Sequence, residues 1–304
     1  MMNSSRVDST TGQADGLMAR GQALTLVYVA LTAASQVFLN HVGSAIPVAV
    51  GLFYMAGAAC VVFNLLELRR IGRNHAALRR CWPAWFAMSA AFVLNWIFSY
   101  YSVTHAPADF FIAVFFLSSA LCSCIRDRAL LKGIATALTL AAVGYLAQAQ
   151  ALQLFTSMLA GTCMYFYYLS SVRFSQQSGL GPVAVVSLRC YLLFTCCALY
   201  LGFHHAFSSL ALSPENVRNL LVLIVANMVL PSLLSQTCLH WVGVTVFTFM
   251  NSLIPLLAFL MQAALSGEWQ GRMLLAITLA TCMLNHERLL ALTRRMVPRA
   301  GGEE

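Results

Sequence analysis

Charged residues are scarce in this chain. Only 9% of its 304 residues are charged and 60% are hydrophobic, whereas a soluble domain ordinarily carries about 25% charged residues. The composition therefore excludes a soluble globular protein. The net charge of +8 is due to Lys and Arg residues in short segments between apolar runs, as in a membrane protein. We therefore expect the lipid bilayer, and no nucleic acid, as a partner.

Motifs of the common catalytic and metal sites are also missing. The sequence contains no P-loop, no H-E-x-x-H and no G-x-S-x-G. None of its ten cysteines belongs to a C-x-x-C, and most lie in apolar runs, where cysteine is typically a small packing residue. We therefore expect no enzyme activity, no metal and no cofactor. Without an ATP site, any uphill transport would use an ion or substrate gradient.

The apolar residues form ten segments, which predicts an all-α membrane protein with ten transmembrane helices. The segments are 23–42, 45–66, 82–103, 108–125, 131–149, 152–172, 183–203, 220–242, 243–272 and 273–292. The ninth is expected to begin with a turn at Gly243, contains Pro255 and ends at Gly267-Glu268. The basic segment 69–80 is predicted as a loop between the second and third spans.

The positions of the basic residues predict the orientation of the chain. With the N-terminus in the cytoplasm, every Lys and Arg except Arg189, Arg218 and Arg272 falls on the cytoplasmic side or in a cytoplasmic tail. This asymmetry follows the positive-inside rule. We therefore place both termini in the cytoplasm, with 1–21 and 293–304 as tails that lie outside the spans.

An internal repeat is predicted from two similar stretches. The run Pro47-Val48-Ala49-Val50 is repeated as Pro182-Val183-Ala184-Val185, 135 positions later, and 104–107 resembles 240–243 at nearly the same offset. Residues 22–149 would then form one five-helix repeat and 150–292 a second. Because five is odd, the second half would be inserted upside down, as in many secondary transporters with a substrate site between the halves.

Taken with the ten spans, several residues resemble the EamA-type branch of the drug/metabolite transporter (DMT) superfamily. They are Gly243, Thr245, Pro255, Gly267 and Glu268, and Pro182 followed by Arg189. The resemblance covers about 22–292. It implies a multi-pass protein of the cytoplasmic (inner) membrane that exports or exchanges small metabolites, amino acids and opine-type compounds among them. The first half departs from the pattern, since Tyr54 stands where the second half has Arg189.

Two ionisable residues lie within predicted spans. Arg189, about two turns into the seventh segment, is expected to hold a substrate carboxylate through two hydrogen bonds. A snorkelling or carbonyl-capping arginine is the alternative. Asp109, in the first turn of the fourth segment, either carries a coupling proton or binds the free N–H groups of that helix N-terminus, and the sequence favours the latter role.

Two prolines predict breaks in the eighth and ninth segments. Pro231 removes the hydrogen bond to the carbonyl of Asn227, and Pro255 removes the one to the carbonyl of Asn251. An amide side chain therefore accompanies each break. These amides are expected to bind a polar substrate or, alternatively, only to satisfy the local backbone.

Aromatic side chains complete the predicted substrate site. Trp96 and Tyr100 lie four residues apart, and Tyr165 and Tyr168 three apart, so each pair shares a helix face. Together with Tyr54 they are predicted to line the cavity, although such pairs are also common as packing residues. The cavity is expected between the second, third, sixth, seventh, eighth and ninth spans.

These features predict a secondary transporter that exports a small polar metabolite, bearing a carboxylate and an amine, by alternating access. A non-transporting membrane sensor or scaffold is one alternative, because it also explains the spans. An importer or exchanger of the same fold is another. The expected partners are a small-molecule substrate and the bilayer, and a homodimer is left open.

Overall fold

The computed structural model of this chain describes the backbone of residues 5–286. Side chains are described from residue 19 onwards, except at scattered positions between 236 and 248. The described part consists of helices and short connections, without a β-strand. The α-helices are α1 (Ser5–Val42), α2 (Val48–Leu66), α3 (Ile71–Arg80), α4 (Trp82–His105), α5 (Ala108–Arg126), α6 (Leu130–Leu146), α7 (Ala151–Ser178), α8 (Pro182–Phe203), α9 (Pro214–Leu223), α10 (Leu230–Asn251), α11 (Ile254–Ser266) and α12 (Gly271–Leu284).

Within residues 5–286, seven helical segments are long and apolar enough to cross a membrane. They are Ala19–Ala45, Val48–Leu66, Trp82–His105, Ala108–Arg126, Pro182–Phe203, Pro214–Ser235 and Phe249–Ser266. The apolar helices α6 and α12 are shorter. The chain is therefore a multi-pass, all-α membrane protein, whereas ten crossings and two repeats stay predictions.

Proline and glycine mark the ends of these helices. Pro47 and Pro107 directly precede α2 and α5 with nearly identical backbone angles, φ −53° at both. A proline there costs no hydrogen bond, because the first N–H groups of a helix have no intrahelical partner. Gly179 and Gly267 follow α7 and α11 with φ of +67° and +72°, the left-handed conformation that ends many helices.

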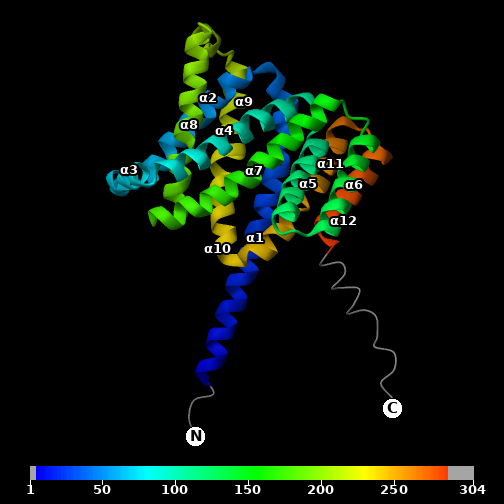
Figure 1. The fold of residues 1–304 in the computed structure, drawn as a ribbon, viewed down its shortest axis with the longest axis horizontal. Coiled ribbons are helices and arrows are strands. Elements are labelled where there is room, and N and C mark those ends of the chain that lie inside the picture. Colours follow the sequence, from blue (N-terminus) through cyan, green and yellow to red (C-terminus); the bar gives the residue numbers. More distant parts are fainter. Residues whose placement is uncertain (1–4, 287–304) are drawn as a thin grey trace.

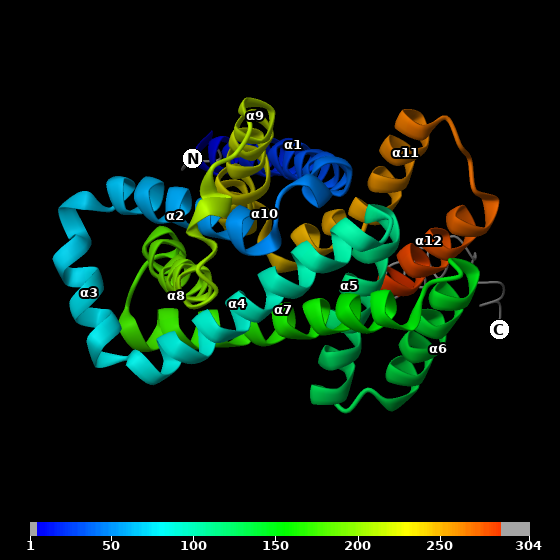
Figure 2. The same ribbon diagram turned by 90° about the horizontal axis from the view of Figure 1, so that it is seen from above.

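The helices form one bundle in which α4 and α7 run side by side across the molecule (Figures 1 and 2). Helices α2, α3, α8 and α9 lie towards one end of this pair, and α5, α6, α11 and α12 towards the other. The long helices α1 and α10 pack against each other. Very close approach occurs at Gly161 of α7, where an added Cβ would stand 2.1 Å from the carbonyl oxygen of Phe115 in α5.

Two local predictions are wrong. The segment 69–80, expected as a loop, contains the helix α3, which buries Asn74 and Ala77 against the bundle. The turn expected at Gly243 does not exist, because α10 continues without interruption to Asn251. The chain bends at Ser252 and Leu253 instead, where two backbone hydrogen bonds reach back to Phe249 and Met250. The match between 104–107 and 240–243 consequently pairs the end of a helix with the middle of one.

Candidate functional site

A cavity of ≈ 170 Å³ lies between helices of both halves of the chain. It is lined by Tyr28, Thr32, Gln36, Phe92, Asn95, Trp96, Ser99, Phe111, Ile112, Phe115, Phe116, Met164, Tyr167, Tyr168, Arg189, Asn227, Pro231, Ser232, Ser235, Asn251 and Ile254. Aromatic rings form much of this lining, and one cation and several amides and hydroxyls interrupt it. Such a mixture is typical of small-molecule sites, in which few polar groups fix the orientation of a ligand.

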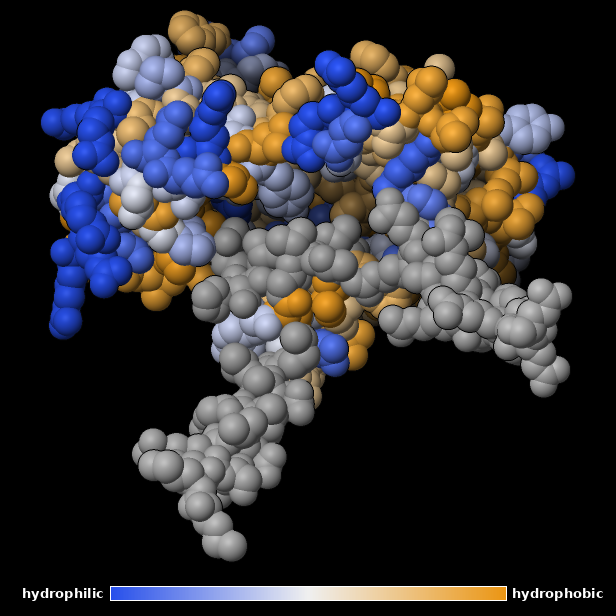
Figure 3. Space-filling model, turned by 60° about the horizontal axis from the view of Figure 1, so that its bottom comes forward, coloured by the Kyte–Doolittle hydropathy of each residue, from blue (hydrophilic) through white to orange (hydrophobic). Residues whose placement is uncertain are grey.

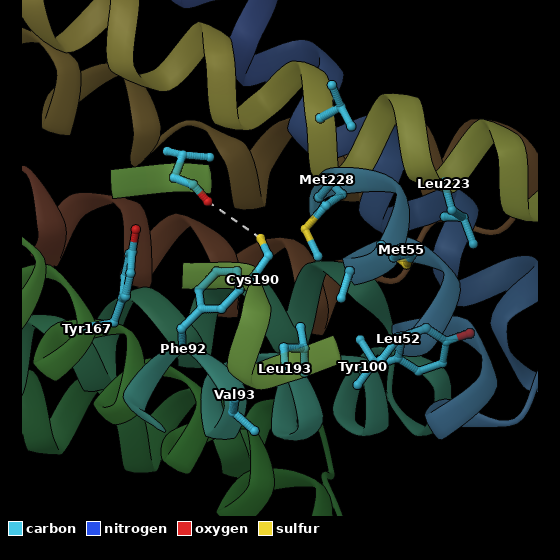
Figure 4. Packing of buried hydrophobic residues seen from close by; sticks show 14 of the residues in the cluster. Leu52, Met55, Phe92, Val93, Tyr100, Tyr167, Cys190, Leu193, Leu223 and Met228 are labelled. Atoms are coloured by element: carbon cyan, nitrogen blue, oxygen red, sulfur yellow. Dashed lines mark hydrogen bonds between the residues drawn. The ribbon is translucent and has the colours of Figure 1, made fainter. Parts of the chain in front are cut away.

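Arg189 is the cation of this cavity and only 7% of its surface is exposed. Its Nη1 donates to the Tyr167 hydroxyl, and its Nη2 donates to Ser232 Oγ at 2.7 Å. The guanidinium carbon stands 4.5 Å from the ring centre of Phe92 and 5.4 Å from that of Tyr167. The rings of Phe92 and Tyr167 are neighbours, with 5.3 Å between their centres (Figure 4). Arg189 is therefore held by hydroxyl groups of α7 and α10 and by ring faces of α4 and α7.

No described carboxylate balances the charge of Arg189. Among the described residues the ion pair lies elsewhere, between Arg126 and Asp127 at the turn after α5. The Nε atom of Arg189 is buried and has no hydrogen-bond partner. A buried charge without an opposite charge is costly. The guanidinium thus keeps both an uncompensated charge and an unused donor for an anion.

A group of amides also lines the cavity, at a point where the chain leaves α-helical geometry. Residues Ile224–Val229 form the π-helix η4, directly before Pro231. Within it, Asn227 Oδ1 accepts hydrogen bonds from Gln36 Nε2 at 3.0 Å and from Ser35 Oγ at 3.3 Å. Asn227 Nδ2 and Gln36 Oε1 are buried without partners. The π-helix thus leaves one free donor on Asn227, and α1 leaves one free acceptor on Gln36, in residues that line the cavity.

Asn251 reaches the cavity from the end of α10, at the break before α11. Its Oδ1 atom is buried and unpaired. The next residue, Ser252, accepts a hydrogen bond at 2.6 Å from Asn285 Nδ2 at the end of α12. Pro255 lies in the first turn of α11, so it starts a helix within the candidate span Phe249–Ser266. The expected break is present there, but it follows α10 rather than kinking one continuous helix.

Six of the predicted site residues line the cavity, namely Arg189, Asn227, Asn251, Trp96, Tyr168 and Pro231. Three predicted tyrosines lie outside it. The Tyr54 hydroxyl donates to Leu210 O at 3.0 Å, and the fully buried Tyr100 hydroxyl donates to Ile46 O at 3.4 Å. The ring of Tyr165 instead packs against Arg126 at the α5–α6 turn, with 5.6 Å between its centre and the guanidinium carbon. Backbone carbonyls thus accept from the hydroxyls of Tyr54 and Tyr100, and Tyr165 packs against Arg126.

Asp109 and Pro255 also lie outside the lining. Asp109 is 3% exposed and its Oδ1 accepts a hydrogen bond at 2.8 Å from the backbone N–H of Phe110. It therefore sits in the first turn of α5, as a carboxylate that binds free N–H groups does. The expected boundaries of the cavity also change, because α2 does not contribute, whereas α1 and α5 do.

Several lining residues were missed from the sequence, and Tyr167 is the most important of them. The pair Tyr165 and Tyr168 was chosen for its spacing of three, but the face that lines the cavity contains Met164, Tyr167 and Tyr168. Met164 lies three residues before Tyr167 and four before Tyr168, so this set also had the spacing of one helix face. For Ser232, the only sequence feature that could have indicated a site residue is its position next to Pro231. No sequence feature indicated Gln36 as a site residue.

A second hollow, of ≈ 560 Å³, lies away from Arg189. It is lined by Gly144, Tyr145, Leu146, Gln148, Ala149 and Arg272, at the turn after α6 and the start of α12. Tyr145 is 83% exposed there. This hollow is therefore an open surface depression, and the smaller cavity with its buried polar groups is the stronger candidate.

Comparison with known proteins gives the fold but no family. No family model matches this chain, and no curated protein matches it. One solved structure, described only as the crystal structure of a protein, has a TM-score of 0.58 and 18% sequence identity. The match covers 93% of this chain and 99% of the other. At this identity the likeness concerns the fold alone, over nearly the whole of both chains.

Proposed function

We propose that this protein is a secondary transporter of the EamA type, which moves a small polar metabolite across the cytoplasmic membrane by alternating access. The substrate carries a carboxylate, and Arg189 binds it. The observation that carries this proposal is the guanidinium of Arg189, buried in a cavity between helices with a free Nε and no described counter-charge. A carboxylate supplies that counter-charge and accepts from Nε and a neighbouring Nη in the bidentate geometry that arginine favours.

The pairing of helices supports two inverted repeats. In the proposed order, α1, α2, α4, α5 and α6 are segments one to five, and α7, α8, α9–α10, α11 and α12 are segments six to ten. If each helix is replaced by its counterpart in the other half, the contact between α4 and α7 becomes the contact between α10 and α1. The contact between α5 and α7 becomes the one between α11 and α1 in the same way. The α2–α8 and α6–α12 contacts convert into themselves. A two-fold relation between the halves accounts for all these pairs.

The position of the cavity supports alternating access. Helices α1, α4 and α5 of the first half line one part of it, and α7, α8, α10 and α11 of the second half line the rest. Two interruptions of regular α-helix border it, the π-helix η4 and the bend at Ser252. Broken helices at a site between two repeats are a recurring design of secondary transporters.

The amides give the substrate a second polar end. Asn251 Oδ1 and Gln36 Oε1 are unpaired acceptors, and Asn227 Nδ2 is an unpaired donor. An amine or hydroxyl group is the chemistry that two acceptors bind. The ring faces of Trp96 and Tyr168 complete the lining. Export, and compounds of the amino-acid or opine type, are proposed from the resemblance to the EamA branch.

Metabolite profiling of cells and medium tests this function directly. The gene is deleted in one strain and overexpressed in another, and both compartments are compared with the parent strain. We expect one carboxylated compound to accumulate inside the deletion strain and to increase in the medium on overexpression. The opposite movement would identify an importer. Purified protein in vesicles that takes up none of the affected compounds would favour the sensor or scaffold alternative.

A further inference from the structure

A strongly basic surface surrounds α3, at the edge of the bundle. It consists of the exposed residues Arg69, Arg70, Arg73, Arg79 and Arg80, from the short helix Leu68–Arg70 and from α3. We call it the basic α3 surface. Between residues 65 and 82 only Glu67 is acidic. Hydrophilic side chains gather at this end of the molecule in the space-filling view (Figure 3).

Specific contacts hold this surface in place. Asn74, on the inner face of α3, is 1% exposed and donates to Glu67 Oε2 at 3.2 Å. The ring of His75 stacks on Tyr191 of α8 with 5.6 Å between ring centres. Arg80 donates to the carbonyl of Ser178, the last residue of α7, at 3.3 Å. The cations are thus presented on an ordered element, so binding an anion there does not have to order a loop first.

Exposed apolar side chains adjoin the basic α3 surface on both sides in the sequence. Leu65, Leu66 and Leu68 precede it and Trp82 follows it, and each is between 58% and 62% exposed. A free polar anion would contact the arginines only and would leave these side chains in water. A phospholipid satisfies both, because its headgroup carries the negative charge and its acyl chains cover apolar surface. Trp is typical of the interface between headgroups and chains.

From this combination we propose that the basic α3 surface binds anionic phospholipid headgroups at the cytoplasmic face. The occupant is a lipid rather than a soluble phosphate, since the arginines and the exposed Leu and Trp side chains are neighbours. Each basic residue near an anionic leaflet adds favourable binding energy, so several arginines together select anionic over zwitterionic lipid. The site is separate from the cavity around Arg189, and its test does not depend on transport.

Lipid binding to the full-length protein in mild detergent tests this proposal. Phosphatidylglycerol and phosphatidylcholine are titrated separately, and bound lipid is counted by native mass spectrometry. The double variant Arg73→Gln/Arg79→Gln removes two charges from the basic α3 surface. We expect its affinity for phosphatidylglycerol to fall roughly thirtyfold, while its weak binding of phosphatidylcholine stays unchanged.

Two matched variants make the result specific. Arg126→Gln/Arg128→Gln removes the same number of charges from the turn after α5, where Arg126 already pairs with Asp127 at 2.8 Å; we expect wild-type affinity within about twofold. Arg73→Lys/Arg79→Lys keeps the charge and should restore most of the binding. The proposal is overturned if both double Gln variants lose binding equally, if phosphatidylcholine binds as tightly as phosphatidylglycerol, or if glycerol phosphate without acyl chains competes fully.

Discussion

Arg189 and Asp109 are both more than nine-tenths buried, yet their surroundings differ. Arg189 faces the cavity, contacts side chains of three other segments and keeps an unpaired Nε. Asp109 lies in the first turn of α5, outside the cavity, where Phe110 supplies a backbone N–H. Burial of an ionisable group in a membrane bundle therefore does not by itself mark a site. Access to a cavity, with unused hydrogen-bonding capacity, separates the two residues.

The largest effect is expected from Arg189→Lys. A lysine keeps the charge but cannot bind a carboxylate through two parallel N–H groups, and it loses the contact with Ser232. Transport in vesicles should fall at least about tenfold, with unchanged abundance of the variant in the membrane. The initial rate per amount of reconstituted protein is the measurement. Wild-type rates would remove Arg189 from the substrate site.

A smaller effect is expected from Tyr167→Phe, which removes the hydroxyl that accepts from Arg189 and keeps the ring. A hydrogen bond to a charged group contributes about 1.5–3 kcal/mol, but Arg189 keeps its charge and its bond to Ser232, so KM should rise only about three- to tenfold, with a smaller change in kcat. Tyr100→Phe is the matched control, because the Tyr100 hydroxyl donates to Ile46 O instead. An equal rise in KM in both variants would point to a general loss of packing.

The smallest effect on transport is expected from Asp109→Asn. The amide oxygen still accepts from the Phe110 N–H, so only the charge at the helix N-terminus is lost, at about 0.3–1 kcal/mol of stability. KM should stay within about twofold of wild type, and a pH gradient should drive transport in both proteins to the same extent. Loss of pH-driven transport alone would reassign Asp109 to proton coupling and end the contrast with Arg189.

The positions of most helices along the chain were predictable from the sequence, because membrane spans are long apolar runs and proline or glycine stands at many of their ends. Helices α2 and α5 begin directly after Pro47 and Pro107, and α8 begins at Pro182. The end of α10 was misplaced because Gly243 was taken as a turn, although glycine is tolerated within a helix; Pro255, in the first turn of α11, marks the real break more closely. Residues 69–80 were misjudged because a basic, amphipathic stretch does not distinguish a solvated loop from a short surface helix.

The cavity was only partly predictable. Arg189, Asn227 and Asn251 stand out in the sequence, since polar residues are rare inside spans and each proline exposes a carbonyl. The tyrosines do not stand out in the same way. Tyr54, Tyr100 and Tyr167 all lie within predicted apolar spans. Only the packing of neighbouring helices decides which hydroxyl donates to a backbone carbonyl and which accepts from Arg189.

The π-helix Ile224–Val229 has a consequence for how such a site arises. A π-turn holds one residue more than an α-turn, so its geometry is that of an α-helix with one additional residue. Removing one residue there would restore α-geometry and rotate the following helix by about 100°, which would carry Ser232 away from Arg189. The pairing of these two residues thus depends on the length of the chain at this turn, so a single-residue deletion would abolish it and a compensating insertion would restore it.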